Sequence, residues 1–332
     1  MSFLANGEKR FAIDVVPAFT SGTKNEFGDE IFWVPEILET SIRKRATQYV
    51  KLLEAKKTER EWWLRSDPLG YIRIAADLNA LNGDFRKTTK FIKRWKYNCE
   101  ARSDDFSLKS FHIEQVLLEI YKQNPGVSIF DALFGFLYDI PKIIAQPQIR
   151  DRANHTKFID DYVKDLTGQQ RKRIIQARDY FLIELENIPH NSSVAGLLGA
   201  GFHERADPAE QYLFDSRIPA LVDPSANLQI TATVLPRDGF RAFVLSALGI
   251  INIDRKIQFR ANIDYGHPID LQKWKVKNDN KSPQPRGEIT DHVTRNDPEL
   301  TKYNGSHFVE CYGIKDGVCI ARARQNVVLK HA

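Results

Sequence analysis

The chain has 332 residues, of which 42% are hydrophobic and 27% charged, and its 48 basic and 43 acidic side chains leave a formal charge of +5. This balance is typical of a soluble globular protein of about two domains and excludes long disorder, collagen and a coiled-coil rod. No apolar run reaches the roughly 20 residues that cross a bilayer, and the N-terminus has no signal-peptide pattern, so we expect a cytoplasmic protein without a membrane span.

Strand patterns come first along the chain. Residues 8 to about 35 alternate apolar and polar side chains and are rich in β-branched and aromatic residues, which predicts strands. From about 37 to 187, apolar residues instead recur every three or four positions, which is typical of amphipathic helices. This helical spacing is clearest in residues 42–53, 91–95, 113–120, 128–138 and 167–185.

The composition changes again after residue 187. Residues from about 188 to 216 are rich in Gly, Pro, Asp and Asn, which predicts a linker. From Leu228 onward alternating strand patterns return, interrupted by a polar Pro-containing loop at 278–286. We therefore predict an α+β fold with segments at residues 1–36, 37–190, 191–225 and 226–332.

The three cysteines are too few and too scattered for a disulfide framework or a zinc site. Two of them, Cys311 and Cys319, flank a hairpin signal at Asp316-Gly317. With a two-residue loop, Ile314 lies opposite Cys319 and Cys311 lies opposite Arg322, so the two cysteines point to opposite faces of the sheet. We expect all three cysteines to be reduced, buried and to pack as small hydrophobic residues.

Asp14 stands inside an otherwise apolar strand pattern, AIDVVPAF. A buried carboxylate is costly unless it is paired or binds a metal ion, which makes Asp14 a candidate metal ligand. The alternative is an aspartate at a strand end that caps a neighbouring backbone group. The strand pattern alone leaves both interpretations open.

Further short motifs follow Asp14 in order: WVPE, WLRSDP, LNALNGDF, FIKRWK and SLKSFHIE, all before residue 120. Together they resemble the cGAS/DncV-like nucleotidyltransferases (CD-NTases, SMODS family), the bacterial anti-phage (CBASS-type) synthetases of cyclic di- or oligonucleotide second messengers. The resemblance implies a partial, polymerase β-like nucleotidyltransferase sheet in residues 1–36 and a helical half in 37–190. It also implies ATP, GTP or other nucleoside triphosphates as substrates, Mg²⁺ or Mn²⁺ in a two-metal site, and a separate effector protein.

The same resemblance assigns roles to four residues. Asp14 matches the third metal-binding, catalytic carboxylate. Lys93 matches a lysine that binds the triphosphate, and its alternative is a solvated lysine on a basic helix. Ser110 and Phe111 match a pair in which the serine binds the triphosphate at a helix N-terminus and the aromatic ring stacks on the base. Their alternative is a helix N-terminal cap with Phe111 in the core.

The C-terminal part resembles a different module. The motifs WKVKN, Arg286-Gly287, TKYNGSH and HFVECYGIKDGVCIA are similar to the adenylyl/guanylyl and SMODS C-terminal sensor (AGS-C) domain, over residues from about 200 to 332. The resemblance implies a mainly β sensor domain in residues 226–332, behind a linker and entry segment, that binds a cyclic nucleotide. The candidate pocket residues, chosen for base stacking, phosphate binding and base-edge contacts, are Trp274, Lys275, Lys277, Asn278, Arg286, His307 and Glu310.

These candidates cannot all line one pocket. In a strand, Trp274 and Asn278 share one face whereas Lys275 and Lys277 share the other. Trp274 is more often a core residue than a stacking platform. For His307 the alternative is a hydrogen-bonded strand histidine without a ligand.

The first two metal carboxylates of the resembled synthetases, an Asp-x-Asp after a Gly-Ser loop, have no counterpart in this chain, because only thirteen residues precede Asp14 and no Asp-x-Asp occurs. One carboxylate cannot hold two metal ions, so we expect no nucleotidyl transfer from the chain as it stands. We favour an N-terminally truncated product; the alternative function is a non-catalytic, nucleotide-binding sensor or regulatory protein. DNA or RNA binding is not expected, because the basic runs at 43–45 and 171–173 alternate with acids and indicate solvated helix faces.

Overall fold

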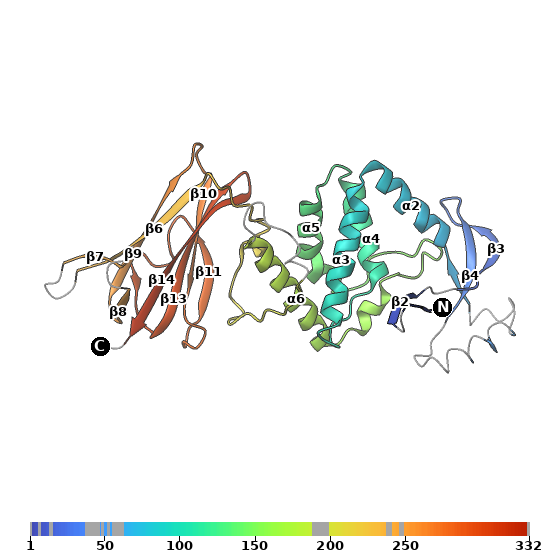
Figure 1. Cartoon of the computed structure of the whole chain (residues 1–332), viewed down its shortest axis with the longest axis horizontal. Coiled ribbons are helices and arrows are strands. Elements are labelled where there is room, and N and C mark those ends of the chain that lie inside the picture. The colour runs from blue at the N-terminus through green and yellow to red at the C-terminus, as the bar shows by residue number, and fades with distance from the viewer. Residues whose placement is uncertain are drawn as a thin grey trace. The chain divides into compact units, whose positions relative to one another are not determined.

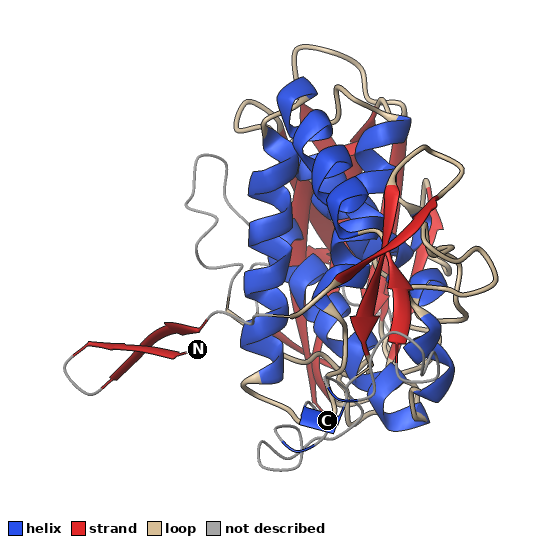
Figure 2. Ribbon diagram, turned by 90° about the vertical axis from the view of Figure 1, so that its right-hand side faces the viewer, coloured by secondary structure: helices blue, strands red, loops and turns tan. Residues whose placement is uncertain are grey.

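The computed structural model describes residues 2–5, 8–12, 16–36, 63–187, 199–236, 241–245 and 249–330, together with single positions 47, 50, 51 and 54. The chain divides into two compact units: residues 1–90, 109–132 and 142–166 form the first, and residues 91–108, 133–141 and 167–332 the second. Helices and sheets both occur (Figure 2), so the predicted α+β class is confirmed. The units follow packing rather than chain order, and the predicted domain boundaries stay predictions.

Two small antiparallel sheets belong to the first unit. Strands β1 (Ser2–Ala5) and β2 (Glu8–Ala12) pair with each other, and β3 (Phe19–Lys24), β4 (Glu30–Pro35) and β5 (Trp63–Ser66) form a second sheet in that order. Strands β2, β3 and β4 confirm strand structure within the predicted interval 8–35, but residues 16–18 of the AIDVVPAF pattern lie in no strand.

Strand β5 interrupts residues 37–187, which the sequence predicts to be mostly helical. Its first residue, Trp63, pairs with Pro35 of β4, is only 4% exposed and contacts the Phe19 ring edge-on at 5.1 Å between ring centroids. Pairing with a strand almost thirty residues earlier decides the conformation here, and that pairing has no trace in the local periodicity.

Five helices lie within the described residues. They confirm the remaining helical prediction for residues 68–186. Helix α2 begins where the Asp67 carboxylate accepts a hydrogen bond from the Gly70 amide, and α6 begins with a capping box between Thr167 and Gln170. The predicted helix at 42–53 lies outside the described residues except for helical positions 47, 50 and 51. The helices are α2 (Pro68–Leu81), α3 (Asp84–Glu100), α4 (Ser110–Gln123), α5 (Ile129–Ile143) and α6 (Gly168–Glu186).

Aromatic side chains join α6 to the second half of α3 within the second unit. Phe181 of α6 meets Phe91 edge-on at 6.0 Å and Trp95 at 5.9 Å between ring centroids. Trp95 and Phe181 are almost fully buried. The two helices therefore share one apolar contact beside Lys93, which lies between the two α3 rings in the sequence.

The rest of the second unit is a β-sandwich. One sheet has the order β11-β10-β13-β14-β8 and the other the order β12-β9-β6-β7. Figure 1 labels these strands except β12. All pairings are antiparallel except β14 with β8. The strands are β6 (Asn227–Val234), β7 (Phe243–Val244), β8 (Ile250–Asn252), β9 (Lys256–Asp264), β10 (Leu271–Lys277), β11 (Arg286–Asp291), β12 (Glu299–Leu300), β13 (Gly305–Lys315) and β14 (Val318–Lys330).

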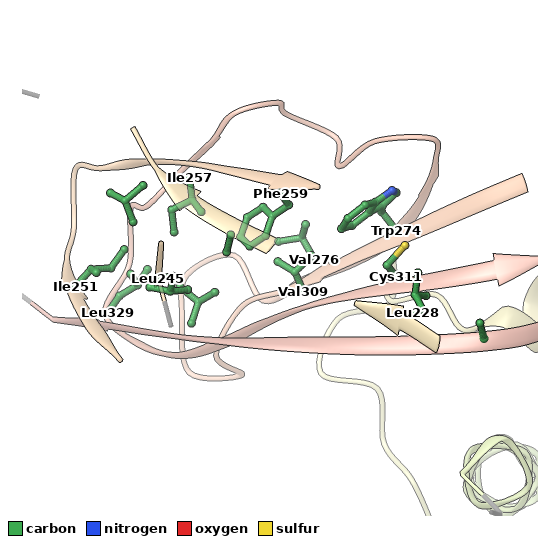
Figure 3. Packing of buried hydrophobic residues seen from close by; sticks show 14 residues of the cluster. Leu228, Leu245, Ile251, Ile257, Phe259, Trp274, Val276, Val309, Cys311 and Leu329 are labelled. Carbon is green, nitrogen blue, oxygen red and sulfur yellow. The ribbon is translucent and has the colours of Figure 1, made fainter. Parts of the chain in front are cut away.

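The core of the sandwich forms where the inward-facing side chains of the two sheets meet. Ile257 and Phe259 of β9 pack against residues such as Val276 and Val309 of the facing sheet, and Trp274 continues this cluster along β10 (Figure 3). Because strand side chains alternate between faces, the same strands also present a second set of residues on the outer face of the five-stranded sheet.

The hairpin of β13 and β14 differs from its prediction in register. Ile314 lies opposite Cys319 as predicted, but Cys311 lies opposite Ala323 rather than Arg322. The register shifts after Gly313, because β14 carries one extra residue there, and a bulge of this kind cannot be read from the turn sequence. Cys311 and Cys319 still lie on opposite faces, in separate apolar clusters, and all three cysteines are free and buried.

Trp274→Ala should lower the free energy of unfolding of the sandwich by about 3–5 kcal/mol, because it empties a large buried volume. Urea unfolding followed by circular dichroism measures the loss. Val244→Ala, on a residue that is 44% exposed, is the control and should change stability by less than about 0.5 kcal/mol. Wild-type stability in Trp274→Ala would contradict the core assignment.

Candidate ligand-binding cavity

A cavity of about 760 Å³ opens at one end of the sandwich, between its two sheets. Its inner wall is apolar and consists of core residues from both sheets, while its mouth is polar. Cavities of this size hold small-molecule ligands, and an apolar interior with a few polar groups is typical of such sites. The apolar residues include Ile257, Phe259, Val276, Val309, Val327 and Leu329, and the polar ones Asp207, Asn278, Arg286, Glu288, Arg295, Asn296, Glu299, Lys302 and His307.

A β-bulge places Arg286 at the mouth. Lys275 pairs with Ile289 and Lys277 with Arg286, so β11 has one residue more than β10 over this interval. Arg286 takes the left-handed conformation, with φ at 56°, and Gly287 follows with φ at 128°. Positive φ values cost free energy for a residue with a Cβ and recur at bulges that redirect a side chain.

The Arg286 side chain ties the two sheets together. Its guanidinium donates hydrogen bonds to Glu288 of its own strand, at 2.7 and 2.9 Å, and to Glu299 of β12 in the other sheet, at 2.8 and 3.2 Å. Burial raises the pKa of Glu288, but the hydrogen bonds and charge of Arg286 outweigh it and hold that pKa below its ordinary value. The mouth of the cavity therefore contains a charged clamp rather than a free arginine.

His307 and Asn278 form a second polar group on the cavity wall. The His307 Nε2 lies 2.8 Å from the Tyr303 carbonyl oxygen, and the Asp279 amide donates to Nδ1 at 3.1 Å. These partners assign the neutral Nε2–H tautomer. Burial lowers the pKa of His307 below its ordinary value. Asn278 donates to the Gln284 carbonyl and so fixes the β10–β11 loop.

The charges that line the cavity are balanced. Arg286, Arg295 and Lys302 face three carboxylates, those of Asp207, Glu288 and Glu299. Arg295 is 67% exposed, with its guanidinium 3.7 Å from the Glu288 carboxylate, and Lys302 is exposed, so both long side chains can reach a ligand at the mouth.

Four other predicted pocket residues lie elsewhere: Trp274, Lys275, Glu310 and Lys277, which is 5% exposed. Trp274 is 2% exposed in the sandwich core and donates to the His292 carbonyl oxygen at 3.0 Å. Lys275 and Glu310 are 3% exposed on the outer face of the five-stranded sheet. The alternation predicted for β10 is thus observed, while the ligand roles of these four residues stay predictions.

Lys275 and Glu310 belong to a buried charged cluster on that outer face. The Lys275 Nζ donates to the Gln211 carbonyl at 2.7 Å and lies 3.4 Å from the Glu210 carboxylate. Burial lowers the pKa of Lys275. Glu310 accepts hydrogen bonds from Tyr312 at 2.7 Å and from Arg322 at 2.6 Å, and Arg322 holds its pKa below the ordinary value against the opposing effect of burial.

The candidates of the helical region are divided between the units. Ser110 is the first residue of α4 and is exposed, and Phe111 is 39% exposed with its ring 4.9 Å from the Tyr71 ring. The cap position before α4 is Lys109, so the alternative of Ser110 as the cap with Phe111 in the core does not describe this helix. Lys93 lies half-buried on α3 in the second unit. Their nucleotide roles stay predictions.

Asp14 lies outside the described residues. Within the part of the chain that the structure describes, no three His, Cys, Asp or Glu side chains are arranged to hold a metal ion. Mg²⁺ and Mn²⁺ therefore stay predictions that rest on the sequence resemblance.

Residues 209–330 match the family model of the adenylyl/guanylyl and SMODS C-terminal sensor domain. The match supports the sensor-domain prediction. The matched region, called the sensor-like domain below, contains both sheets and every residue named at the cavity except Asp207. No curated protein and no solved structure shows significant similarity to the chain. Among the described helices, none is long and apolar enough to cross a membrane.

Sequence reasoning missed several functional candidates. Glu288, Arg295 and Glu299 line the cavity, and Glu210 lies behind its wall, yet none belongs to the motifs that suggested the sensor-like domain. Lys302 also lines the cavity and lies within the TKYNGSH motif, but it was not among the candidate pocket residues. Their positions depend on how the loops between strands return to the mouth. The charged residues within β11 offered the only local signal, since a charged pair in a short strand needs partners.

The free energy of unfolding should depend on pH through the protonation of His307. Because burial lowers its pKa below 6.5, the unfolded chain binds a proton at a higher pH than the folded chain does. Its contribution to stability is therefore complete above about pH 6.5 and declines as the pH falls toward the folded-state pKa. In His307→Gln, the free energy of unfolding should fall less steeply as the pH is lowered. Urea unfolding between about pH 7.5 and 5.5 measures the difference.

His267→Gln is the matched control for that measurement, because His267 is exposed. It should leave the pH dependence of the wild type unchanged. Equal slopes for wild type and His307→Gln would show that His307 is not held neutral by the fold.

Proposed function

We propose that the sensor-like domain binds a nucleotide in the cavity between its sheets. The observation that carries this proposal is the coincidence of two findings: the cavity is lined, except for Asp207, by residues of the region that matches a sensor-domain model. The resemblance of the motifs suggests a cyclic nucleotide as the ligand. Other classes of small molecule with an apolar ring and anionic groups are outcomes of the test.

The lining supports one orientation of such a ligand. The apolar inner wall suits a base, whose ring faces are poorly hydrated. Asn278 and His307 line the same cavity, with their polar atoms already hydrogen-bonded within the protein. Phosphates stay at the mouth, where Arg295 and Lys302 supply exposed positive charge. Arg286 remains bound to its two glutamates and shapes the mouth.

Lys302→Ala should weaken nucleotide binding about 5- to 10-fold, because it removes one charge-assisted contact to phosphate. Calorimetry with ATP, GTP, cyclic di-AMP and cyclic GMP-AMP measures the affinities. Lys315→Ala is the control: it removes the same charge at the other end of β13 and should change nothing. If no nucleotide binds, or if both variants weaken binding equally, the cavity is not the nucleotide site.

We infer a second function from the resemblance of residues 10–120 to the cyclic-nucleotide synthetases. In it, Asp14 is the third metal-binding carboxylate, Lys93 and Ser110 contact the triphosphate, and Phe111 stacks on the base. The exposure of Ser110 and Phe111 at the start of α4 favours this assignment. The product is a messenger for a separate effector protein.

Lys93→Ala and Ser110→Ala should each weaken binding of ATP or GTP in the presence of Mg²⁺ by about 5- to 10-fold, through loss of a phosphate contact. Equilibrium dialysis with labelled triphosphate, carried out in the Lys302→Ala background to weaken the contribution of the cavity, measures this site. Lys87→Ala, a 70% exposed lysine on the same helix as Lys93, is the control. Unchanged affinity in both test variants would remove the triphosphate assignment.

A further inference from the structure

The segment of residues 203–215 connects the cavity wall to helix α6. Its Gln211 amide donates to the Gly287 carbonyl at 3.0 Å, and the Gln211 side chain accepts from the Ile289 amide at 2.8 Å. Two residues of the segment, Asp207 and Ala209, line the cavity itself. The segment therefore runs along β11 immediately behind Arg286.

Glu210 is the tightest point of this contact. Its side chain is 5% exposed and lies against Gly287 so closely that a Cβ at position 287 would be 2.8 Å from the Glu210 Cγ. The carboxylate lies 3.4 Å from the Lys275 Nζ and 3.6 Å from the Lys277 Nζ. A buried carboxylate between two buried lysines cannot shift without leaving a charge unpaired, so its position follows that of the strand beside it.

Lys277 couples the same carboxylate to the clamp. Its Nζ lies 3.3 Å from the Arg286 carbonyl oxygen and 3.5 Å from that of Pro285. A displacement of the backbone at the bulge therefore changes the partners of Lys277 and, through them, those of Glu210.

From Glu210 the contacts continue to α6. Arg205 donates to the Glu210 carbonyl at 2.7 Å and to the Asp179 carboxylate at 2.9 Å. Asp179 lies on α6 and is 2% exposed. The His203 amide adds a hydrogen bond of 3.0 Å to the Gln176 carbonyl of the same helix.

Helix α6 in turn contacts α3. The Phe181 ring, half a turn beyond Asp179, packs on Phe91 and Trp95, which flank Lys93 in sequence. All of these residues belong to the second unit. A continuous series of buried and half-buried contacts thus runs from the cavity mouth to the helix that carries a candidate phosphate-binding lysine.

We infer that Glu210 couples the state of the cavity wall to α6 and α3, so that a ligand in the cavity changes the stability of the helix bearing Lys93. Glu210 is a positioning residue in this scheme and touches no ligand. The inference rests on the proposed function for the identity of the ligand, but the coupling itself is tested without one.

Hydrogen exchange measured by mass spectrometry on the full chain tests the coupling. Gly287→Ala forces the new Cβ against Glu210, and Glu210→Gln keeps the shape but removes the charge. Each should speed exchange in peptides of residues 168–186 and 91–100 by about threefold or more, as expected when the local opening of these helices becomes easier. Unchanged exchange in Glu210→Gln would overturn the inference even if Gly287→Ala fails to fold.

Two matched controls separate coupling from general damage. Gly317→Ala also places a Cβ at a positive-φ glycine, in the β13–β14 turn, but meets no atom within 4 Å. Glu204→Gln removes an exposed ion pair to Lys172 of α6, and exposed pairs contribute little. Equal acceleration of exchange in either control would attribute the effect to strain or surface charge and overturn the inference.

The same hydrogen-exchange experiment is repeated with ATP and with cyclic di-AMP as probes. The coupling is supported if the ligand protects the cavity peptides 256–264 and 286–300 together with the α6 peptide 168–186 in the wild type. In Glu210→Gln, the ligand should protect the cavity peptides alone. Protection of the cavity peptides alone in the wild type overturns it and leaves the proposed function intact. Absence of cavity protection overturns the proposed function, and the coupling is then decided by the ligand-free variants.

Discussion

One guanidinium, that of Arg286, holds the two sheets of the sandwich together at the mouth of its cavity. Glu288 and Glu299 come from different sheets, and without a cation between them their carboxylates would repel each other in a half-buried environment. The backbone accepts a left-handed residue and a bulge to bring Arg286 to this place. This strain is compensated by four charge-assisted hydrogen bonds, which are stronger than those between neutral groups.

The simple alternation of strand side chains then separates two environments along β10. Trp274 and Val276 face the sandwich core, and Val276 also borders the cavity. Lys275 and Lys277 point away, into a layer of buried charge with Glu210. A ligand-sized space and a charged cluster thus lie on the two faces of one strand. Any change in the position of β10 or its neighbour β11 affects both environments.

The fold was largely predictable because most of its helices and strands show a local periodicity of apolar residues in the sequence. Period-two alternation located β6, β9 and the β13–β14 hairpin, and helical spacing located the stretches from 91 to 185. The failures have one physical origin. Trp63 forms a strand, and β14 bulges opposite Gly313, because of partners that are distant in sequence or of a single extra residue in a ladder.

The candidate site was predictable only in part, for the same reason. Asn278, Arg286 and His307 line the cavity because they stand at strand ends on its side, which their motifs and alternation suggested. Glu210 comes from a polar connecting segment that has no periodicity, and it is buried against partners distant in sequence: Lys275, Lys277 and Gly287, which has no side chain. Chain order gives no indication that these four residues meet.

The balance of charge in the cavity bears on how ligand binding there would affect the neighbouring helices. A phosphate that displaced a glutamate from Arg286 would leave a buried carboxylate unpaired, which is costly. A phosphate held by the exposed Arg295 and Lys302 leaves the clamp closed. The proposed coupling then needs no rupture of the clamp, since Gly287 and Glu210 touch with no space between them. In a closely packed interior, a displacement of β11 by a few tenths of an ångström is sufficient to move Glu210.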